Sequence, residues 1–376
     1  MNIGIISVME GYPWGGSEEL WFEMATNALH QKHRVEVSVK YWTGKNSKLE
    51  TLKTHGAKLH FRKRSFLKSL TNKIRFSMGL HPANSFLGNY DADVLIVNEG
   101  SAFEFTKNLY WTRFALNSKV PYSFIIQNVF ENEPLNDTRR ERALAVYKGA
   151  KALYFVSHRN LEVVQRQLAF KLANAAVINN PVAIPVLLPL RSQYSVQDQT
   201  INFAVVGRLD CHSKGQDILL EVLSKADWKN RKWHLNLYGV GNDLKHLESL
   251  IRYYNLSERV TLNGFTPIEK IWNSNQILIM PSFNEGTSLA LLEAMSYGIP
   301  SVVTDVGDQA VWVEDGINGF VAAAPTVKLI GQAMERCWQL KSKWLEMGNH
   351  ARAKIIRCFP QAAGTDLLER VKQLVP

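Results

Sequence analysis

The pattern that most limits the fold of this chain is a strand, turn and helix unit that recurs along two successive stretches. The first stretch has a helical segment at 17–30 and short apolar runs at 3–8, 35–39, 92–97, 121–126 and 152–156. The second begins at 201, with the runs "INFAVV", "WHLNLYG", "VTLNG", "QILIMPS" and "IPSVVTD". Continuously apolar strands that alternate with helices form parallel sheets covered on both faces. The sequence therefore predicts an α/β protein with two such sheets in tandem.

A proline-containing stretch separates the two series. Residues 181–199, "PVAIPVLLPLRSQYSVQDQ", combine three prolines with a polar end and are typical of a linker. We therefore expect one domain at about 1–180 and a second at about 195–355. A length of 376 residues also favours two cores over one. No apolar run reaches the ~20 residues of a membrane span, and the N-terminus lacks a basic leader, so we expect a cytoplasmic protein.

The basic excess lies in the first half of the chain. Residues 1–200 hold 25 Lys and Arg against 16 Asp and Glu, whereas residues 201–376 hold 19 against 18. Nucleic acid, an anionic membrane or a phosphorylated substrate each fits such a surface. The stretch 58–80 holds seven Lys or Arg and no acidic residue, with Leu67, Leu70 and Ile74 at helical spacing. It is either a helix packed on the first sheet or a peripheral contact with the inner face of a membrane.

Ligands of open parallel sheets bind beyond the carboxyl ends of the strands, so the loops there are the candidate sites. In "MEGYPWGGSEEL", Gly15 and Gly16 precede Ser17, a good helix N-cap, and can bring backbone N–H groups to an anion; a plain capped turn fits equally well. In "VVGRLDCHSKGQDILL", Arg208 and Lys214 suit a diphosphate, although the P-loop order is absent. Solvated surface charge is the alternative.

Two further loops follow strands of the second series. In "NGFTP", Gly264 allows a tight turn, and Phe265 is predicted to pack in the core rather than stack on a planar ring. In "PSFNEGTSLALLEAMSYG", Glu285 precedes a helix whose first N–H groups belong to Gly286, Thr287 and Ser288, and Glu293 lies inside that helix. A carboxylate pairs well with the hydroxyls of a sugar. Our hypothesis is one glutamate for each of two sugar rings, with phosphates between them.

These stretches resemble the GT-B glycosyltransferases, specifically the retaining family 4 (group 1). The similarity spans nearly the whole chain and is strongest in "VGRLD…KGQDILL", "NGF" and "PSFNEGTSLALLEAMSYGIPSVVTD". It implies two Rossmann-like domains facing each other across a cleft, with a C-terminal helix, 360–376, that returns to the first domain. By resemblance, Glu285 contacts the donor sugar, Glu293 binds the ribose, and Arg208 and Lys214 hold the diphosphate. The backbone of Gly286–Leu289 would contact sugar and phosphate, and Gly16 would line the cleft.

The resemblance has one departure, on the acceptor side. Many family members have a histidine where this chain has "FIIQNVFENE", so Gln127 and Asn128 are the candidate sugar contacts here; His158 follows the next strand. The expected partners are a UDP- or GDP-sugar and an unidentified hydroxyl acceptor, without cofactor or metal. Several family members act on lipid-linked acceptors, so the resemblance makes such an acceptor a candidate here. The Asp91–Ala92–Asp93 match to a metal-binding D-x-D precedes its strand, which is the wrong end of the sheet.

Two other functions stay open at this point. A nucleotide-sugar epimerase would use the same fold, because fold alone does not determine function. A nucleic-acid-binding protein would use the basic first half, although no long platform of aromatic and basic residues accompanies it. The sequence favours a glycosyltransferase acting in glycan, polysaccharide or glycolipid synthesis.

Overall fold

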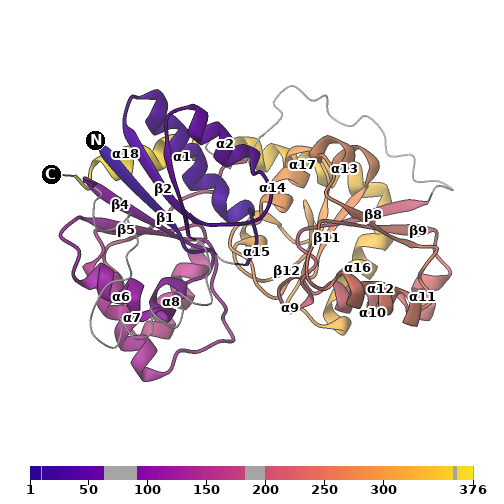
Figure 1. The fold of residues 1–376 in the computed structure, drawn as a ribbon. Helices are drawn as coiled ribbons and strands as arrows, with labels where there is room; N and C mark the ends of the chain where they lie inside the picture. The colour runs from indigo at the N-terminus through magenta and orange to yellow at the C-terminus, as the bar shows by residue number, and fades with distance from the viewer. Residues whose placement is uncertain (10, 63–90, 183–199, 359–361, 376) are drawn as a thin grey trace. The chain divides into compact units, whose positions relative to one another are not determined.

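The structure, a computed structural model, describes residues 1–9, 11–62, 91–182, 200–358 and 362–375. They form two compact units. Unit 1 comprises Met1–Pro181 and Ala362–Pro376, and unit 2 comprises Val182–Gln361 (Figure 1). The chain therefore passes from unit 1 to unit 2 and back again. The assignment of unit 1 to the acceptor and of unit 2 to the nucleotide-sugar stays a prediction.

Unit 1 is built on a parallel sheet of seven strands in the order β3-β2-β1-β4-β5-β6-β7. Its register pairs Ile3 with Val35 on one side and with Val94 on the other. The strands are β1 (Asn2–Ser7), β2 (Arg34–Lys40), β3 (Lys58–Arg62), β4 (Val94–Glu99), β5 (Tyr122–Ile126), β6 (Ala152–Phe155) and β7 (Ala175–Val177).

Helices cover both faces of this sheet, because successive residues of a strand point to opposite sides. Ile3 and Ile5 of β1 pack with α1, α2 and α18, and Ile6 packs with the helices of the other face. Figure 1 shows α1, α2 and α18 on one face and α6, α7 and α8 on the other. The helices are η1 (Gly16–Glu18), α1 (Glu19–His30), α2 (Ser47–Thr54), α5 (Glu104–Lys107), α6 (Leu109–Leu116), α7 (Asp137–Gly149), α8 (His158–Leu168) and α18 (Ala363–Lys372).

The returning helix α18 is part of the unit 1 core. Leu367, Leu368 and Val371 are fully buried in the cluster that also holds Leu20 and Met24 of α1. The two helices approach closely at Gly364, where a Cβ atom would overlap Glu23 and the backbone of Met24. Asn27 Nδ2 also donates to Thr365 Oγ1 at 3.0 Å.

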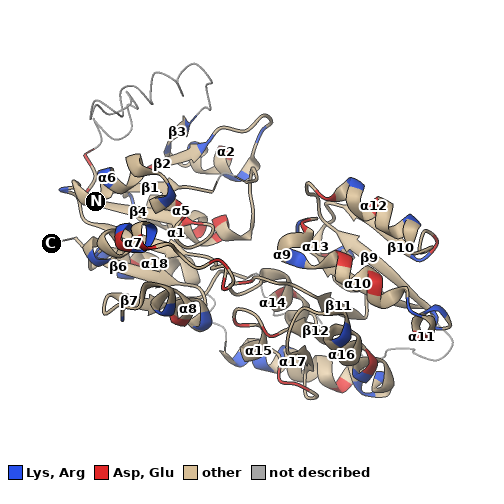
Figure 2. Cartoon of the chain, turned by 90° about the horizontal axis from the view of Figure 1, so that it is seen from below, with Lys and Arg blue, Asp and Glu red and all other residues tan. Residues whose placement is uncertain are grey.

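Unit 2 repeats the design with a parallel sheet of six strands in the order β10-β9-β8-β11-β12-β13. In Figure 2 these strands carry neither blue nor red, as expected for strands buried on both faces. They are β8 (Ile201–Val206), β9 (Trp233–Tyr238), β10 (Val260–Gly264), β11 (Ile277–Met280), β12 (Ser301–Thr304) and β13 (Gly319–Ala322).

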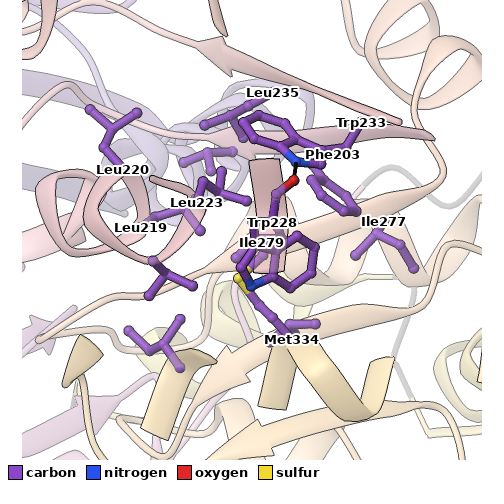
Figure 3. Close-up of a cluster of buried hydrophobic side chains, with 14 of the residues drawn as sticks. Phe203, Leu219, Leu220, Leu223, Trp228, Trp233, Leu235, Ile277, Ile279 and Met334 are labelled. Carbon is purple, nitrogen blue, oxygen red and sulfur yellow. Dashed lines mark hydrogen bonds between the residues drawn. The ribbon is translucent and has the colours of Figure 1, made fainter. Parts of the chain in front are cut away.

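Two clusters of buried side chains lie on the two faces of the second sheet. One of them is shown in Figure 3, where Phe203 stacks near Trp233 and the Trp233 indole donates to the Trp228 carbonyl at 2.7 Å. The helices are α9 (Cys211–Lys214), α10 (Gln216–Leu223), α11 (Ala226–Lys229), α12 (Leu244–Tyr253), α13 (Ile268–Ser274), α14 (Leu289–Ser296), α15 (Gln309–Trp312), α16 (Val327–Gln339), η2 (Lys341–Lys343) and α17 (Trp344–Cys358).

The predicted fold class is confirmed: each unit is a Rossmann-like α/β domain with a parallel sheet. Three strands, β3, β7 and β13, were not predicted. Residues 58–62, at the start of the basic stretch, form β3. Residues 63–80 of that stretch, with Leu67, Leu70 and Ile74, and residues 183–199 of the expected linker lie outside the described residues. Among the described residues, every helix is too short or too polar to span a bilayer.

Candidate functional site

The strand order of unit 2 reverses between β8 and β11, which are neighbours in the sheet although two strands and five helices separate them along the chain. In open α/β sheets the ligand crevice lies at such a switch point, beyond the carboxyl ends of the strands. The loop after β8 carries Arg208 and runs into α9, whose last residue is Lys214. The loop after β11 runs into α14 and carries Glu285. Both sequence-predicted loops are therefore at the expected edge of the sheet.

The structure brings Lys214 and Glu285 into direct contact. Lys214 Nζ lies 2.6 Å from Glu285 Oε1, and the two side chains are 19% and 8% exposed. Ser282 Oγ donates to the same carboxylate oxygen at 2.8 Å. Ser282 is itself held through its carbonyl, which accepts from Thr304 Oγ1 at 2.6 Å. Ser282, which the sequence interpretation missed, thus helps to fix the orientation of Glu285.

Close backbone contacts hold these loops in place. Gly215 ends α9 with a φ of +62°, and a Cβ atom there would overlap the carbonyl oxygen of Pro281 in the loop after β11. Gly307, at a φ of +53°, lies so close to Glu285 and Gly286 that a Cβ atom would overlap both carbonyl oxygens. Positive φ and close approach are the two conditions that require glycine. The position of Glu285 therefore depends on Gly307, which the sequence interpretation did not select.

The sequence interpretation had placed Lys214 in a loop. In the structure it is the last residue of the short helix α9. Asp210 caps this helix by accepting from Ser213 N at 3.3 Å. Arg208 lies before the helix with a side chain that is 45% exposed, 4.0 Å from Asp210. A small pocket at this edge is lined by Gly207, Lys214, Gln216, Pro281 and Ser282, among others. Cationic side chains thus reach the carboxyl end of β8 as predicted.

Helix α14 begins immediately after this site. Ser288 is its N-cap residue and Leu289 its first residue, so the helix starts later than predicted and Gly286 and Thr287 lie before it. The N–H groups at its start have no partner within the helix. Thr287 is buried, and the carbonyl of Gly286 accepts from Asp308 N at 3.1 Å. Glu293 lies within α14 and is half-buried. The arrangement places a carboxylate on each side of a helix N-terminus.

The third loop of unit 2 differs from the prediction. Gly264 ends β10 with a φ of +63°, and its carbonyl accepts from Gly239 N at 2.8 Å. Phe265 was predicted to pack in the core, but its side chain is 91% exposed. This prediction was wrong because the chain turns outward at the left-handed Gly264. The ring is therefore presented at the carboxyl edge of the second sheet.

The predicted residues of unit 1 lie at the carboxyl edge of the first sheet. Gly16 begins η1, and Gln127 and Asn128 follow β5. Gln127 is buried, and its Nε2 donates to Asn98 Oδ1 at 3.5 Å. Asn128 is half-buried, and its side-chain oxygen accepts from Val129 N at 2.8 Å. Their contact with an acceptor stays a prediction.

Ser17 was predicted to be the N-cap of the following helix, but it does not cap α1 in the structure. Its hydroxyl contacts Met9 Sδ at 3.2 Å, and α1 starts after Glu18 without a side-chain cap. Glu18 instead turns inward and is only 2% exposed. Trp21, which is also buried and lies three residues later, donates its indole N–H to Glu18 Oε2 at 2.5 Å. Residues three apart lie on the same face of a helix, so the Glu-x-x-Trp spacing could have indicated from the sequence that Glu18 is buried beside Trp21.

Glu18 lies at the centre of a polar network at this edge. Its carboxylate also accepts from Ser7 Oγ at 3.0 Å and from Asn98 Nδ2 at 3.2 Å. Burial raises the pKa of Glu18 to about 7, while the hydrogen bonds from Trp21 and Ser7 oppose that rise. Because Asn98 also meets Gln127, two hydrogen bonds connect Glu18 with the predicted acceptor contact.

The D-x-D match lies at the opposite end of the first sheet. Asp93 accepts from the backbone N–H of Asn2 at 2.7 Å, at the point where β1 begins. Within the described part of the chain, no three His, Cys, Asp or Glu side chains gather as a metal site. The three cysteines, Cys211, Cys337 and Cys358, are unbridged.

The described part of the basic stretch ends at Arg62, which has partners within unit 1. Its guanidinium donates to Ser38 Oγ at 2.8 Å and to the carbonyl of Ser7. The sequence interpretation had counted Arg62 among the cations offered to a membrane. These contacts instead join β3 to β2 and β1.

Residues 200–339, which contain the whole Lys214–Glu285 site, match the family model described as "Glycosyl transferases group 1". Among curated proteins, an uncharacterized glycosyltransferase of Haemophilus influenzae is 27% identical over 188 residues, 50% of this chain and 52% of that protein. The chain thus spans about half the length of this relative. The lipopolysaccharide 1,6-galactosyltransferase of Escherichia coli K12 is 23% identical over 82% of this chain and 81% of its own.

Among solved structures, Anabaena Alr3699/HepE in complex with UDP-glucose has a TM-score of 0.72 and 17% identity. The similarity covers 99% of this chain and 98% of that one, so it shows that both units have the GT-B fold. These comparisons favour a transferase over the nucleotide-sugar epimerase that the sequence had left open.

Proposed function

We propose that this chain is a GT-B glycosyltransferase that moves a sugar from a nucleotide-sugar to a hydroxyl acceptor with retention, as in glycosyltransferase family 4. The observation that carries the proposal is the Lys214–Glu285 pair, 2.6 Å apart, at the two strands of the switch point. A cation beside a carboxylate suits a substrate that joins a phosphate to a sugar. The match of residues 200–339 to the group 1 glycosyl transferases supports this interpretation.

The leaving group is a nucleoside diphosphate, whose negative charge grows as the sugar departs. Arg208, Lys214 and the N–H groups at the start of α14 would stabilise that charge. The departing phosphate would accept the proton of the acceptor hydroxyl, on the same face of the sugar. A protein base is then unnecessary on this route, which is compatible with the amide of Gln127 near the acceptor.

The two glutamates would bind the two sugar rings of the donor. Glu285 would accept from hydroxyls of the transferred sugar, and Glu293 from the ribose. Glu285→Ala should therefore lower turnover far more than affinity for UDP, whereas Glu293→Ala should weaken UDP binding itself. Each lost charged hydrogen bond corresponds to about 1.5–3 kcal/mol. Wild-type kinetics and UDP affinity in both folded variants would refute this assignment.

The reaction is proposed to need no metal, because cationic side chains take the place of one at the diphosphate. Arg208→Ala should lower turnover strongly while leaving the thermal midpoint nearly unchanged, since the side chain is 45% exposed. Activity should persist in EDTA. Loss of activity in chelator, with recovery in manganese or magnesium, would show that a metal site exists.

The donor is proposed to be a UDP-sugar, since the HepE structure holds UDP-glucose. The acceptor is proposed to belong to a surface glycan or glycolipid, as the galactosyltransferase relative acts in lipopolysaccharide synthesis by its name. Such acceptors fit an enzyme at the inner face of the membrane. The basic residues after β3 are the proposed membrane contact, and no nucleic acid is expected.

A thermal-shift panel of nucleoside diphosphates and nucleotide-sugars tests the donor proposal directly. A ligand that binds only the folded protein raises its stability by RT ln(1 + [L]/Kd), about 2.7 kcal/mol at a hundred times Kd. We expect UDP and at least one UDP-sugar to raise the melting temperature, and Lys214→Ala to abolish the shift. The absence of a shift with every nucleotide would overturn the proposed function.

A further inference from the structure

Unit 1 contains a pocket that the proposed donor site does not use. It opens where β1 and β2 end, and ten residues line it. Three of them are aromatic: Tyr12 and Trp14 from the loop after β1, and Trp42 from the segment after β2. All three are half-buried, so their rings are neither enclosed in the core nor fully in solvent. Aromatic side chains in this state are available for stacking against a ligand.

Neighbouring side chains hold two of these rings. Trp14 packs on Trp21 at 5.5 Å between ring centroids, and its Nε1 donates to Glu19 Oε1 at 2.8 Å. Lys40 Nζ, also part of the pocket lining, lies 4.1 Å from the centroid of the Trp42 ring. This cation–π contact restricts the Trp42 ring at the pocket wall. The wall is thus preorganised, which reduces the entropy lost when a ligand binds.

The buried part of the lining is both polar and apolar. Ser7 and Glu18 are 3% and 2% exposed and hydrogen-bonded to each other at 3.0 Å, and Val39 and Leu49 are also buried. The Glu18 carboxylate belongs to the network that passes through Asn98 to Gln127. The pocket and the predicted acceptor contact therefore share one hydrogen-bond network at one edge of the first sheet.

Aromatic walls above a hydroxyl and a carboxyl suit one class of ligand well. The C–H face of a pyranose ring is apolar and packs on aromatic rings, while its hydroxyls pair with carboxylate, hydroxyl and ammonium groups. A lipid tail would lie against Ser7, Glu18 and Lys40 without adding a hydrogen bond to any of them, which is less favourable. We propose that this pocket binds a pyranose ring of a saccharide acceptor, stacked on Trp42 and Tyr12 and bonded at Ser7 and Glu18. This inference rests on the proposed function and specifies its acceptor.

Saturation-transfer NMR on the full chain tests the proposal with simple probes. The probes are the methyl α-glycopyranosides of glucose, galactose and mannose, and N-acetylglucosamine, each at millimolar concentration. At least one should bind the wild type. Trp42→Ala should weaken that binding about tenfold or more, since aromatic anchors dominate such contacts. Tyr12→Ala makes the same comparison if Trp42→Ala does not fold.

Two control variants make the result decisive. Tyr41→Ala removes the adjacent aromatic side chain, which is 44% exposed, contacts Phe61 and is not part of the pocket lining; it should bind the glycoside normally. Glu285→Ala should also bind it normally, because the donor sugar is proposed to bind there. The inference is overturned if no probe binds, if Trp42→Ala and Tyr12→Ala bind normally, or if Glu285→Ala loses the binding. UDP thermal shifts, measured in parallel, report separately on the proposed donor function.

Discussion

Lys214 Nζ lies 2.6 Å from Glu285 Oε1, although 71 residues separate the two along the chain. Their charges therefore neutralise each other at the edge where a diphosphate and a sugar are proposed to bind. A donor that enters this site must share or displace the pair. The free energy of the pair is thus part of both the stability of unit 2 and the affinity for the donor.

A double-mutant cycle should reveal that coupling. Lys214→Met and Glu285→Gln each leave one partner in a largely buried position, so each should lower the unfolding free energy by about 1.5–3 kcal/mol. The double variant should lose clearly less than the sum of the two, as measured by urea denaturation. The exposed Arg336–Asp315 pair, also at 2.6 Å, is the control and should couple by at most about 1 kcal/mol. Additive losses at Lys214 and Glu285 would contradict the prediction.

Gly307→Ala should displace Glu285 without touching its side chain. The new Cβ atom would overlap the carbonyl oxygens of Glu285 and Gly286, so the loop before α14 must move. We expect turnover, measured as UDP release from the preferred UDP-sugar, to fall at least about tenfold. Gly316→Ala is the matched control, because Gly316 also has a positive φ, +78°, but open space around its Cβ position. Equal activity in the two variants would mean that Gly307 does not position Glu285.

Glu99 should make unit 1 less stable as pH rises. Burial raises its pKa from 4.5 to about 8, while Tyr147 Oη donates to its carboxylate at 2.6 Å. Between these values the folded state keeps the proton and the unfolded state releases it, so stability is highest below pH 4.5 and falls toward pH 8. Within this range, each unit of pH lowers the unfolding free energy by up to about 1.4 kcal/mol.

Glu99→Gln, which carries no titrating proton, should remove this contribution. The difference in unfolding free energy between wild type and variant should then shift in favour of the variant as pH rises through that window. Glu141→Gln, an exposed carboxylate on the α7 helix that also carries Tyr147, serves as the control and should keep the slope of the wild type. Parallel pH profiles of wild type and Glu99→Gln would count against a protonated Glu99.

Charge reversal after β3 should test the proposed membrane contact. Arg62 is held by Ser38 and Ser7, so the informative variant changes Lys63, Arg64 and Lys68 to Glu and leaves Arg62 intact. Wild type should co-sediment with acidic vesicles at low salt, and the variant should not. Each cation that contacts the vesicle surface should contribute about 1 kcal/mol to the binding free energy. The control reverses Lys225, Lys229 and Lys232, three exposed cations of unit 2, and should pellet like wild type. Equal pelleting of wild type with neutral vesicles would exclude an electrostatic contact.

The sequence predicted the features that depend on local patterns. Continuous apolar runs mark β1, β4, β8 and β11, and the loops after β8 and β11 carry the charges that the motif placed there. The strand β3 was missed because "KLHFR" is short and charged and lies next to β2 at one end of the sheet order. Phe265 was assigned to the core from its residue type, whereas the turn at Gly264 determines its exposure.

Contacts between distant segments could not be predicted in the same way. The hydrogen bond from Asn98 to Glu18 spans 80 residues, and the fixing of Glu285 requires Gly307 and Thr304 from the next strand and loop. A single sequence carries no signal for such pairs. It was therefore possible to name Glu285 but not to foresee that Lys214 and Ser282 both bind the same oxygen.

The place of α18 has a consequence for the order in which the protein matures during synthesis. A ribosome completes residues 1–181 long before it makes Ala363–Lys372, yet Leu367, Leu368 and Val371 fill the core beside α1. Until then, Leu20 and Met24 face a gap where α18 will pack. The contiguous unit 2 has no such delay, so it can finish folding while the first-made half of the chain still waits. The nascent first half should accordingly be the part that needs chaperone protection.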